Sequence, residues 1–255
     1  MNCIVLLASA VASTNIVYNA LAREHSDVVV IIEKRVPHQQ LLKRRIKKLG
    51  LVTVIGQVLF MLLVERPLRK LSTHRMAEIN AQFGLDATSI SGTIHYVDSV
   101  NADETRALLQ QLNPALVVVN ATRIISQPIL DAVTARFINI HAGITPTYRG
   151  VHGGYWALAE GRPELAGTTV HLVDKGIDTG KVIKQAIFKA TPEDSIVTYP
   201  FLQLAVGVPI LMQTVRELLQ GKLVLQEPFS SLPSQLHSHP TLWEYLMNRI
   251  ARGVK

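Results

Sequence analysis

The chain has 255 residues and a formal net charge of +7, and 48% of its residues are hydrophobic. Burial of that much apolar side chain can offset the entropy cost of folding, which excludes a mainly disordered protein. The length suits one large α/β domain, or a domain with a small appendage. A single cysteine, Cys3, excludes a disulfide framework and a zinc site made of cysteines. The first residues lack the basic start of a secretory signal, so we expect a cytoplasmic enzyme.

The positive charge is concentrated in one segment. Residues 33–75 contain eleven lysines and arginines and two acids, Glu33 and Glu65, which gives the segment +9 and leaves −2 for the rest. A basic chain often indicates a nucleic-acid or membrane partner. Here such a partner would concern only this segment.

Short runs of apolar, mostly β-branched residues recur along the chain and alternate with helical patterns. Runs of this kind are typical of strands buried on both faces of a parallel sheet. The alternation predicts an α/β fold with a doubly wound, mostly parallel, Rossmann-like sheet. The predicted strands are 3–8, 27–32, 93–97, 115–120 and 136–140, then two joined by a Gly/Asp-rich turn within 167–188. The predicted helices are 14–21, 102–112, 127–134, 196–219 and 242–251.

Residues 36–82 interrupt this alternation. A basic run at 43–48 precedes an apolar stretch over 49–64, and a second basic run ends at Lys70. The apolar stretch has 16 residues, whereas a bilayer span needs about 20, so we do not expect a transmembrane helix. We predict a helical hairpin packed on the domain. The functional alternatives are peripheral attachment to anionic lipid through 36–70, guidance of a phosphorylated substrate, and a dimer contact.

The residue types best suited to catalysis lie at the end of the predicted strand 136–140 and directly after it. Ligands of open α/β sheets bind beyond the carboxyl ends of the strands. Asn139 and His141 are two residues apart, so on a strand they point to the same side. A second cluster at 167–180 supplies His171 and Asp178. An amide donor, an imidazole and a carboxylate suit oxyanion stabilisation with proton transfer. Spacing alone also allows a structural use, with Asn139 capping a turn and His141 hydrogen-bonded in the loop.

Together these segments resemble the folate-dependent formyltransferase family, which includes glycinamide ribonucleotide, methionyl-tRNA and sugar N-formyltransferases. The similarity covers residues 115–219, is weak over 34–90 and is absent after about 225. It implies a formyltransferase fold, with a catalytic domain over 1–222, the basic helical insertion at 36–82 and a C-terminal appendage at 223–255. The matching motifs are Asn139-x-His141, Pro-x-Tyr-x-Gly at 146–150, Gly-x-Thr-x-His at 167–171, and Asp178 before Gly180.

The resemblance implies a mechanism with 10-formyltetrahydrofolate as co-substrate and with no metal. The acceptor amine attacks the formyl carbon, and Asn139 and His141 would donate hydrogen bonds to the oxyanion of the tetrahedral intermediate. Asp178 would raise the pKa of the imidazole and, through water, help to remove the amine proton. The walls of the folate pocket would be Arg123, Ile124 and Ile125 on one side and Val173, Asp174, Lys175 and Gly176 on the other.

Departures from the family pattern narrow the choice of acceptor. Residues 8–15 lack the glycines of a phosphate-binding loop, which disfavours glycinamide ribonucleotide, although Ser13–Asn15 could cap a helix and bind an anion. The Gly150-x-His152 sequence favours that same substrate. About 35 residues after Leu219 are too few for the tRNA-binding domain of the family, so tRNA is not expected. The predicted acceptor-binding residues are Ser13, Thr14, Asn15, Arg149, His152 and His171.

We therefore predict an N-formyltransferase acting on an amino sugar attached to a nucleotide or lipid carrier. The alternatives are phosphoribosylglycinamide formyltransferase, an enzyme for another amine or hydroxylamine, and a non-catalytic folate- or anion-binding module. Sugar formyltransferases often pair, so the resemblance also allows a homodimer. His237 and His239 have no carboxylate or cysteine nearby in the sequence to complete a metal site.

Overall fold

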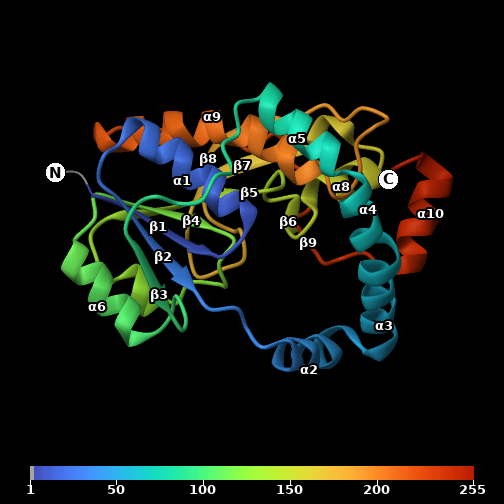
Figure 1. Cartoon of the computed structure of the whole chain (residues 1–255), viewed down its shortest axis with the longest axis horizontal. Helices are drawn as coiled ribbons and strands as arrows, with labels where there is room; N and C mark the ends of the chain where they lie inside the picture. The colour runs from blue at the N-terminus through green and yellow to red at the C-terminus, as the bar shows by residue number, and fades with distance from the viewer. Residues whose placement is uncertain (1–2) are drawn as a thin grey trace.

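The computed structural model describes residues 3–255, and a seven-stranded sheet forms one half of the molecule (Figure 1). The strand order is β3-β2-β1-β4-β5-β7-β8, with parallel pairing from β3 to β5 and antiparallel pairing of β7 with β5 and β8. This confirms the predicted doubly wound, mostly parallel sheet. The strands are β1 (Ile4–Ser9), β2 (Val28–Glu33), β3 (Ile94–Val97), β4 (Leu116–Asn120), β5 (Arg136–His141), β7 (Gly167–Leu172) and β8 (Val182–Ile187).

Helices cover both faces of this sheet, which explains why β1, β2 and β4 are apolar at every position but the last. In β1, Leu6 and its alternate neighbours face α1 and α9, while Val5 and Leu7 face α6 and α7. The helices are α1 (Ala12–Glu24), α6 (Asp103–Leu112), α7 (Gln127–Leu130) and α9 (Tyr199–Leu219). The prediction that α7 extends to residue 134 is wrong, because a turn follows Leu130 and returns the chain to β5 at Arg136.

The insertion is helical, as predicted, but it is not a hairpin. Gly50, at a φ of 83°, turns the chain between α2 and α3, so that α3 leads away along the edge of the molecule (Figure 1). Residues 51–71 form one helix of 21 residues, interrupted only by a π-helical turn at Met61–Glu65. The elements are α2 (His38–Leu49), α3 (Leu51–Phe60), α4 (Arg66–Leu71) and α5 (Thr73–Gln82).

Two helices pass a test of length and composition for crossing a membrane, namely 51–71 and α9. The length argument that excluded a span at 49–64 is therefore wrong, because the apolar stretch belongs to a longer helix. Of the 18-residue apolar stretch of each helix, 44% is buried in α9 but only 22% in 51–71. The contacts of α9 with β7, β8 and the sheet core account for its apolar composition.

A second hydrophobic core lies beside the sheet and joins the insertion to the C-terminal residues. Tyr245 of α10 is 2% exposed, and its ring centroid lies 5.3 Å from that of Phe60 in α3. The backbone N–H of Ile196 donates to the carbonyl of the last residue, Lys255, at 2.7 Å. Residues 223–255 therefore complete this core. The remaining elements are β6 (Tyr148–Gly150), α8 (Gly153–Ala159), a 3-10 turn (Pro163–Leu165), β9 (Gln235–His237) and α10 (Leu242–Arg252).

Candidate active site

A cavity of about 530 Å³ opens at the carboxyl ends of β4 and β5. This is the edge at which open α/β sheets bind ligands. All but four of the predicted site residues line the cavity, and the exceptions are Thr14, Asn15, Arg149 and Lys175. The predicted residues on its walls are Ser13, Arg123, Ile124, Ile125, Asn139, His141, His152, His171, Val173, Asp174, Gly176 and Asp178.

Antiparallel pairing of β5 with β7 brings Asn139 opposite His171. The ring Nδ1 of His171 lies 2.7 Å from the carbonyl oxygen of Leu172. A carbonyl only accepts, so Nδ1 carries a proton, and Nε2 accepts from the Asn139 amide at 3.2 Å. His171 thereby fixes the orientation of the Asn139 amide, whose N–H₂ group also donates to Asp178 Oδ1 at 3.4 Å.

His141 is held in a defined tautomer by the same reasoning. Its Nε2 lies 2.9 Å from the carbonyl oxygen of Tyr148 and must donate. In the neutral ring, Nδ1 then has a free lone pair, 3.4 Å from Asp178 Oδ2.

Burial controls the protonation of His141, which is only 6% exposed. Burial lowers the pKa of His141, and the Asp178 carboxylate and the Tyr148 carbonyl offset this only in part. Asp178 does act to raise the imidazole pKa, as predicted, but its effect is smaller than that of burial. The loss of hydration of the charged ring outweighs the attraction of the carboxylate, so His141 rests in the neutral form.

Asp178 lies in the loop between β7 and β8 with a φ of 51°, in the left-handed region. Its Oδ2 accepts the backbone N–H of Gly150 at 3.0 Å. Burial opposes ionisation, but the neighbouring His171 and His141 rings and this N–H together lower the pKa of Asp178 to about 2. The loop closes tightly at Gly180, where a Cβ would lie 1.6 Å from the carbonyl oxygen of Leu172. Asp178 is thus a fixed negative charge between two histidines.

Arg149 anchors the loop that carries Asp178. Its guanidinium donates to the carbonyl of Ile177 at 3.0 Å and to Ser234 Oγ at 2.7 Å. We infer from these bonds that Arg149 positions the neighbouring Asp178. The geometry favours this positioning role over the predicted role of Arg149 in acceptor binding.

The opposite wall of the cavity, residues 121–125, is held by Glu33 and Asn101, neither of which is among the predicted site residues. Glu33 ends β2, is 4% exposed, and accepts the backbone N–H of Arg123 at 2.9 Å. Asn101 donates to the Ile124 carbonyl and accepts from Ser126 N–H, both at 2.8 Å. The sequence does contain a signal for Glu33. A carboxylate at the end of a continuous apolar strand indicates a buried charge, and such a group needs hydrogen-bond partners.

The predicted acceptor residues on α1 are only partly at the cavity. Ser13 reaches it, but Thr14 is 1% exposed and its hydroxyl donates to the Ser9 carbonyl at 2.7 Å. Asn15 donates to the Ala87 carbonyl at 3.3 Å. The helix begins after Val11, with no side-chain cap. The expected capping role of residues 13–15 is wrong, because they lie inside the first helical turns.

His152 lies at the other end of the cavity, and its Nε2 is 3.0 Å from Nδ1 of His239. Burial, followed by the neighbouring His239 and the charges of Arg69 and Arg45, lowers the pKa of His152 to about 3. Burial, followed by the charge of Arg45, lowers the pKa of His239 to about 4. Arg45, on the basic helix α2, is thus one of the charges that disfavour protonation of both histidines.

Within residues 3–255, no three histidine, cysteine or acidic side chains are grouped so that they could hold a metal ion. The fold and this site define an α/β enzyme in which an amide, an imidazole and a carboxylate meet at the carboxyl edge of a Rossmann-like sheet. The family model described as formyl transferase matches residues 1–214. The chain belongs to the formyl transferase family.

The curated relatives are longer than this chain. A methionyl-tRNA formyltransferase from Koribacter versatilis is 34% identical over 143 residues, which are 56% of this chain and 43% of the relative. Another, from Pelotomaculum thermopropionicum, is 36% identical over 135 residues, which are 52% of this chain and 42% of that relative. The chain thus spans about two fifths of the length of these relatives.

Solved structures share the fold at low sequence identity. A Mycobacterium tuberculosis protein proposed as a sugar N-formyltransferase has a TM-score of 0.60 at 16% identity, with 100% of this chain and 88% of that chain covered. A glycinamide ribonucleotide transformylase from Symbiobacterium toebii has a TM-score of 0.57 at 20% identity, with 89% of this chain and 92% of that chain covered. A Helicobacter canadensis N-formyltransferase was solved with folinic acid and dTDP-3-aminofucose. It has a TM-score of 0.54 at 14% identity, with 93% of this chain and 71% of that chain covered.

Proposed function

We propose that this chain transfers a formyl group from 10-formyltetrahydrofolate to the amine of an amino sugar attached to a nucleotide or lipid carrier. The observation that carries the proposal is the grouping of Asn139, His141 and Asp178 at one cavity, whose other walls are the two loops expected to hold folate. Family membership supports the reaction class. The Helicobacter canadensis structure supports the pairing of a folate with an amino sugar.

The bound folate supplies the formyl group, and the residues present fit such a ligand. Ile124, Ile125 and Val173 give the cavity apolar walls against which a flat heterocycle can pack. The wall at 121–125 is held in place by Glu33 and Asn101, so the peptide groups of this loop are prepositioned to bind a ligand.

His141 takes the proton of the attacking amine at Nδ1. This atom has its lone pair free in the resting site, because Nε2 donates to Tyr148. The imidazolium that forms is stabilised by Asp178, 3.4 Å away and ionised because its pKa is about 2. His141 then delivers the proton to the leaving folate nitrogen, so the site returns to its starting state and the protons balance.

Asn139 stabilises the negative charge that develops on the formyl oxygen. Its two N–H groups are directed to His171 and Asp178 at 3.2 and 3.4 Å, which are long distances for hydrogen bonds. An anionic oxygen in the cavity can compete for one of them, because charge-assisted hydrogen bonds are about twice as strong as neutral ones.

The preference for a sugar carrier rests on the two ends of the cavity. The start of α1 has no glycine loop or side-chain cap to receive a ribonucleotide phosphate. At the other end, basic α2 acts on His152 and His239, where a phosphorylated carrier would meet positive charge. Ser13 at the cavity is the observation that keeps glycinamide ribonucleotide as the second candidate.

The test is an acceptor screen with 10-formyltetrahydrofolate, in which the release of tetrahydrofolate is followed by absorbance. The acceptors are nucleotide-linked amino sugars, a lipid-phosphate-linked amino sugar, glycinamide ribonucleotide and methionyl-tRNA. We expect turnover with an amino sugar that Asn139→Ala abolishes and that the exposed Glu227→Gln control leaves unchanged. Turnover only with one of the last two acceptors would overturn the acceptor assignment. Folate binding without turnover on any acceptor would favour the non-catalytic module and overturn the activity.

A further inference from the structure

The helix at residues 51–71 has an apolar outer side. Its inner side packs on the body of the protein through buried Val54, Gln57 and Phe60. The outward positions form a stripe at helical spacing: Val52, Ile55, Leu59 and Leu62. Val52 is 71% exposed. Among the residues that the structure describes, nothing covers this stripe.

Helix α10 continues the same apolar surface. It carries its own exposed apolar stripe, and its residue Ile250 is 86% exposed. The indole of Trp243 lies on α3 where Gly56 leaves room, since a Cβ there would be 2.2 Å from the ring. The α10 stripe is Trp243, Leu246, Met247 and Ile250.

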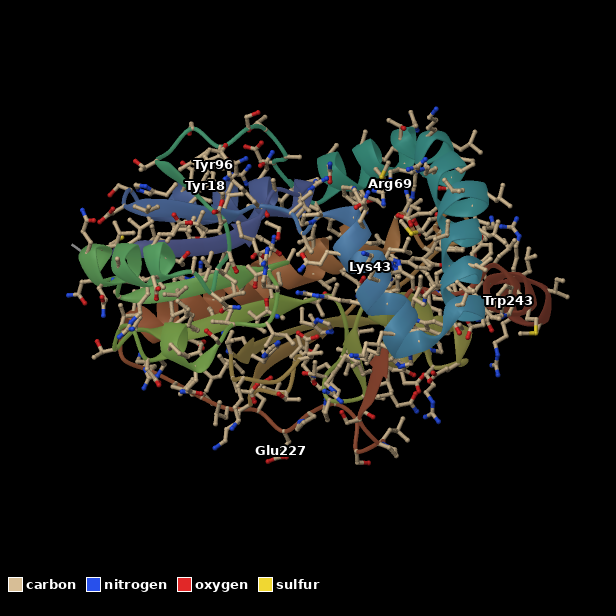
Figure 2. All side chains as sticks on the ribbon, turned by 90° about the horizontal axis from the view of Figure 1, so that it is seen from below. Tyr18, Lys43, Arg69, Tyr96, Glu227 and Trp243 are labelled. Carbon is tan, nitrogen blue, oxygen red and sulfur yellow. The ribbon has the colours of Figure 1, made fainter. Side chains whose placement is uncertain are left out.

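Basic residues lie at both ends of α3. Figure 2 shows Lys43 on α2, Arg69 on α4 and Trp243 on α10 arranged around α3. Helix α2 has five lysines and arginines and no acid between His38 and Leu49, and none of the five has an ion pair within residues 3–255. The acids of this region are engaged: Glu65 pairs with Arg69 at 2.9 Å, and Glu244 caps α10.

We propose that α3 and α10 form a docking surface for an anionic lipid bilayer, with α2 lying among the headgroups. An apolar face bordered by lysine and arginine is the pattern of helices that lie in the membrane interface. A second copy of the chain is a poorer occupant, because a two-fold contact would place two uncompensated α2 helices at the same interface. The surface goes beyond the proposed function and stands independently of it.

The contacts of α3 indicate that it lies in the interface and does not cross the bilayer. Gln57 donates to the His239 carbonyl at 2.8 Å and to Ser238 Oγ at 3.1 Å. Phe60 is fully buried against Tyr245. A crossing would remove these partners and expose the second core to lipid or water. Polar groups without partners in the hydrocarbon region are costly.

The same contacts connect the docking surface to the cavity. Gln57 bonds to His239, and His239 bonds to His152 on the cavity wall. A bilayer on α3 and α10 would therefore lie close to the end of the cavity where the acceptor is expected. This detail rests on the proposed function, and it favours the lipid carrier among the acceptors.

Vesicle flotation tests the docking surface without any activity measurement. The chain of 255 residues is mixed with vesicles of phosphatidylcholine alone or with 30% phosphatidylglycerol, at low and high salt. We expect flotation with the anionic vesicles and a decrease as salt rises. Lys47→Gln/Lys48→Gln should weaken partitioning about 25-fold, since each basic residue near an anionic surface contributes about fivefold. The matched control, Lys189→Gln/Lys222→Gln, also removes two exposed lysines and should have little effect.

The apolar part is tested by Val52→Glu, with Val224→Glu as the control at a site that is also exposed. Val52→Glu should weaken partitioning about tenfold or more, because a buried valine contributes about 1.5–3 kcal/mol. Three results would overturn the proposal: no preference for anionic vesicles, equal partitioning of Val52→Glu and Val224→Glu, or protein that resists carbonate extraction as a spanning helix does. A dimer that Val52→Glu dissociates, without flotation of the wild type, would assign the surface to a second copy.

Discussion

The seven-stranded sheet with its covering helices (the sheet half) differs from the insertion and α10 (the helical half) in how far the apolar side chains are buried. In the sheet half, every face of β1 and β4 is covered by helices, and the apolar strand residues are fully buried. In the helical half, one side of 51–71 packs on Tyr245 while the other side remains exposed. The comparison shows that a helix can be integral to the fold and still leave an apolar surface for a partner.

Charged groups differ between the two halves in the same way. In the sheet half, Glu33 is buried and Asp178 is partly buried, and each accepts hydrogen bonds that fix a loop of the site. The basic residues of α2 are mostly exposed and have no acidic partners among residues 3–255. Buried, paired charges make a rigid site, whereas exposed, unpaired charges of one sign make a surface that attracts an opposite charge.

The largest effect is expected from the sheet half. We propose that His141 carries the proton and that Asp178 stabilises its charged form, so His141→Ala or Asp178→Asn should lower kcat about 10²–10⁴-fold. Steady-state formyl transfer to an accepted amine measures this, with the exposed Glu227→Gln as control (Figure 2). A kcat like that of the wild type in His141→Ala would contradict the proton-transfer role.

The next effect tests whether the C-terminal helix is part of the fold. Tyr245 is 2% exposed against Phe60, so Tyr245→Ala should lower the free energy of unfolding by about 3–5 kcal/mol, the range for a large buried aromatic. Tyr96, which is 67% exposed on β3, gives the control Tyr96→Ala, expected within about 0.5 kcal/mol. Denaturant unfolding compares the two, and equal effects would mean that α10 contributes little.

A smaller effect is expected on the pH dependence of stability. His152 and His239 have pKa values of about 3 and about 4 in the folded protein, whereas an unfolded histidine titrates near 6.5. Between these values the unfolded chain binds more protons, so stability is present above pH 6.5 and is lost as pH falls, by up to about 1.4 kcal/mol per pH unit for each group.

The matched variant for this test is His152→Asn/His239→Asn. Asparagine tolerates the left-handed conformation of His152, whose φ is 59°, and it does not titrate. We expect its unfolding midpoint to vary less than that of the wild type between pH 7 and pH 5. An unchanged slope would assign the acid sensitivity to other groups.

The smallest effect is expected on the exposed side of α3. Val52→Glu should change the free energy of unfolding by at most about 0.5 kcal/mol in the absence of vesicles, because Val52 is 71% exposed. Val54→Glu, on the buried side of the same helix, should be severely destabilising. A large loss of stability in Val52→Glu would show that another surface already covers this side in solution.

The amino-acid sequence by itself predicted the strands of the main sheet and most of the residues that line the cavity. Continuous apolar runs are a local signal, because a strand buried on both faces needs apolar side chains at every position. The pair Asn139 and His141 was also locally readable, because strand geometry places residues two apart on one side. The loop of Asp178 was marked by its glycines, and Gly180 lies where no Cβ would fit.

Only the tertiary structure decided the protonation of the site and the role of the insertion. The pKa of His141 depends on how much water the fold removes, and burial outweighs the nearby carboxylate. Asn101 and Arg149 act through contacts with distant residues, which no local pattern contains. The apolar residues of 51–71 divide into a buried and an exposed side only once Tyr245, far along the chain, packs on one of them. Composition gives the amount of apolar side chain, but only the packing decides which part remains on the surface.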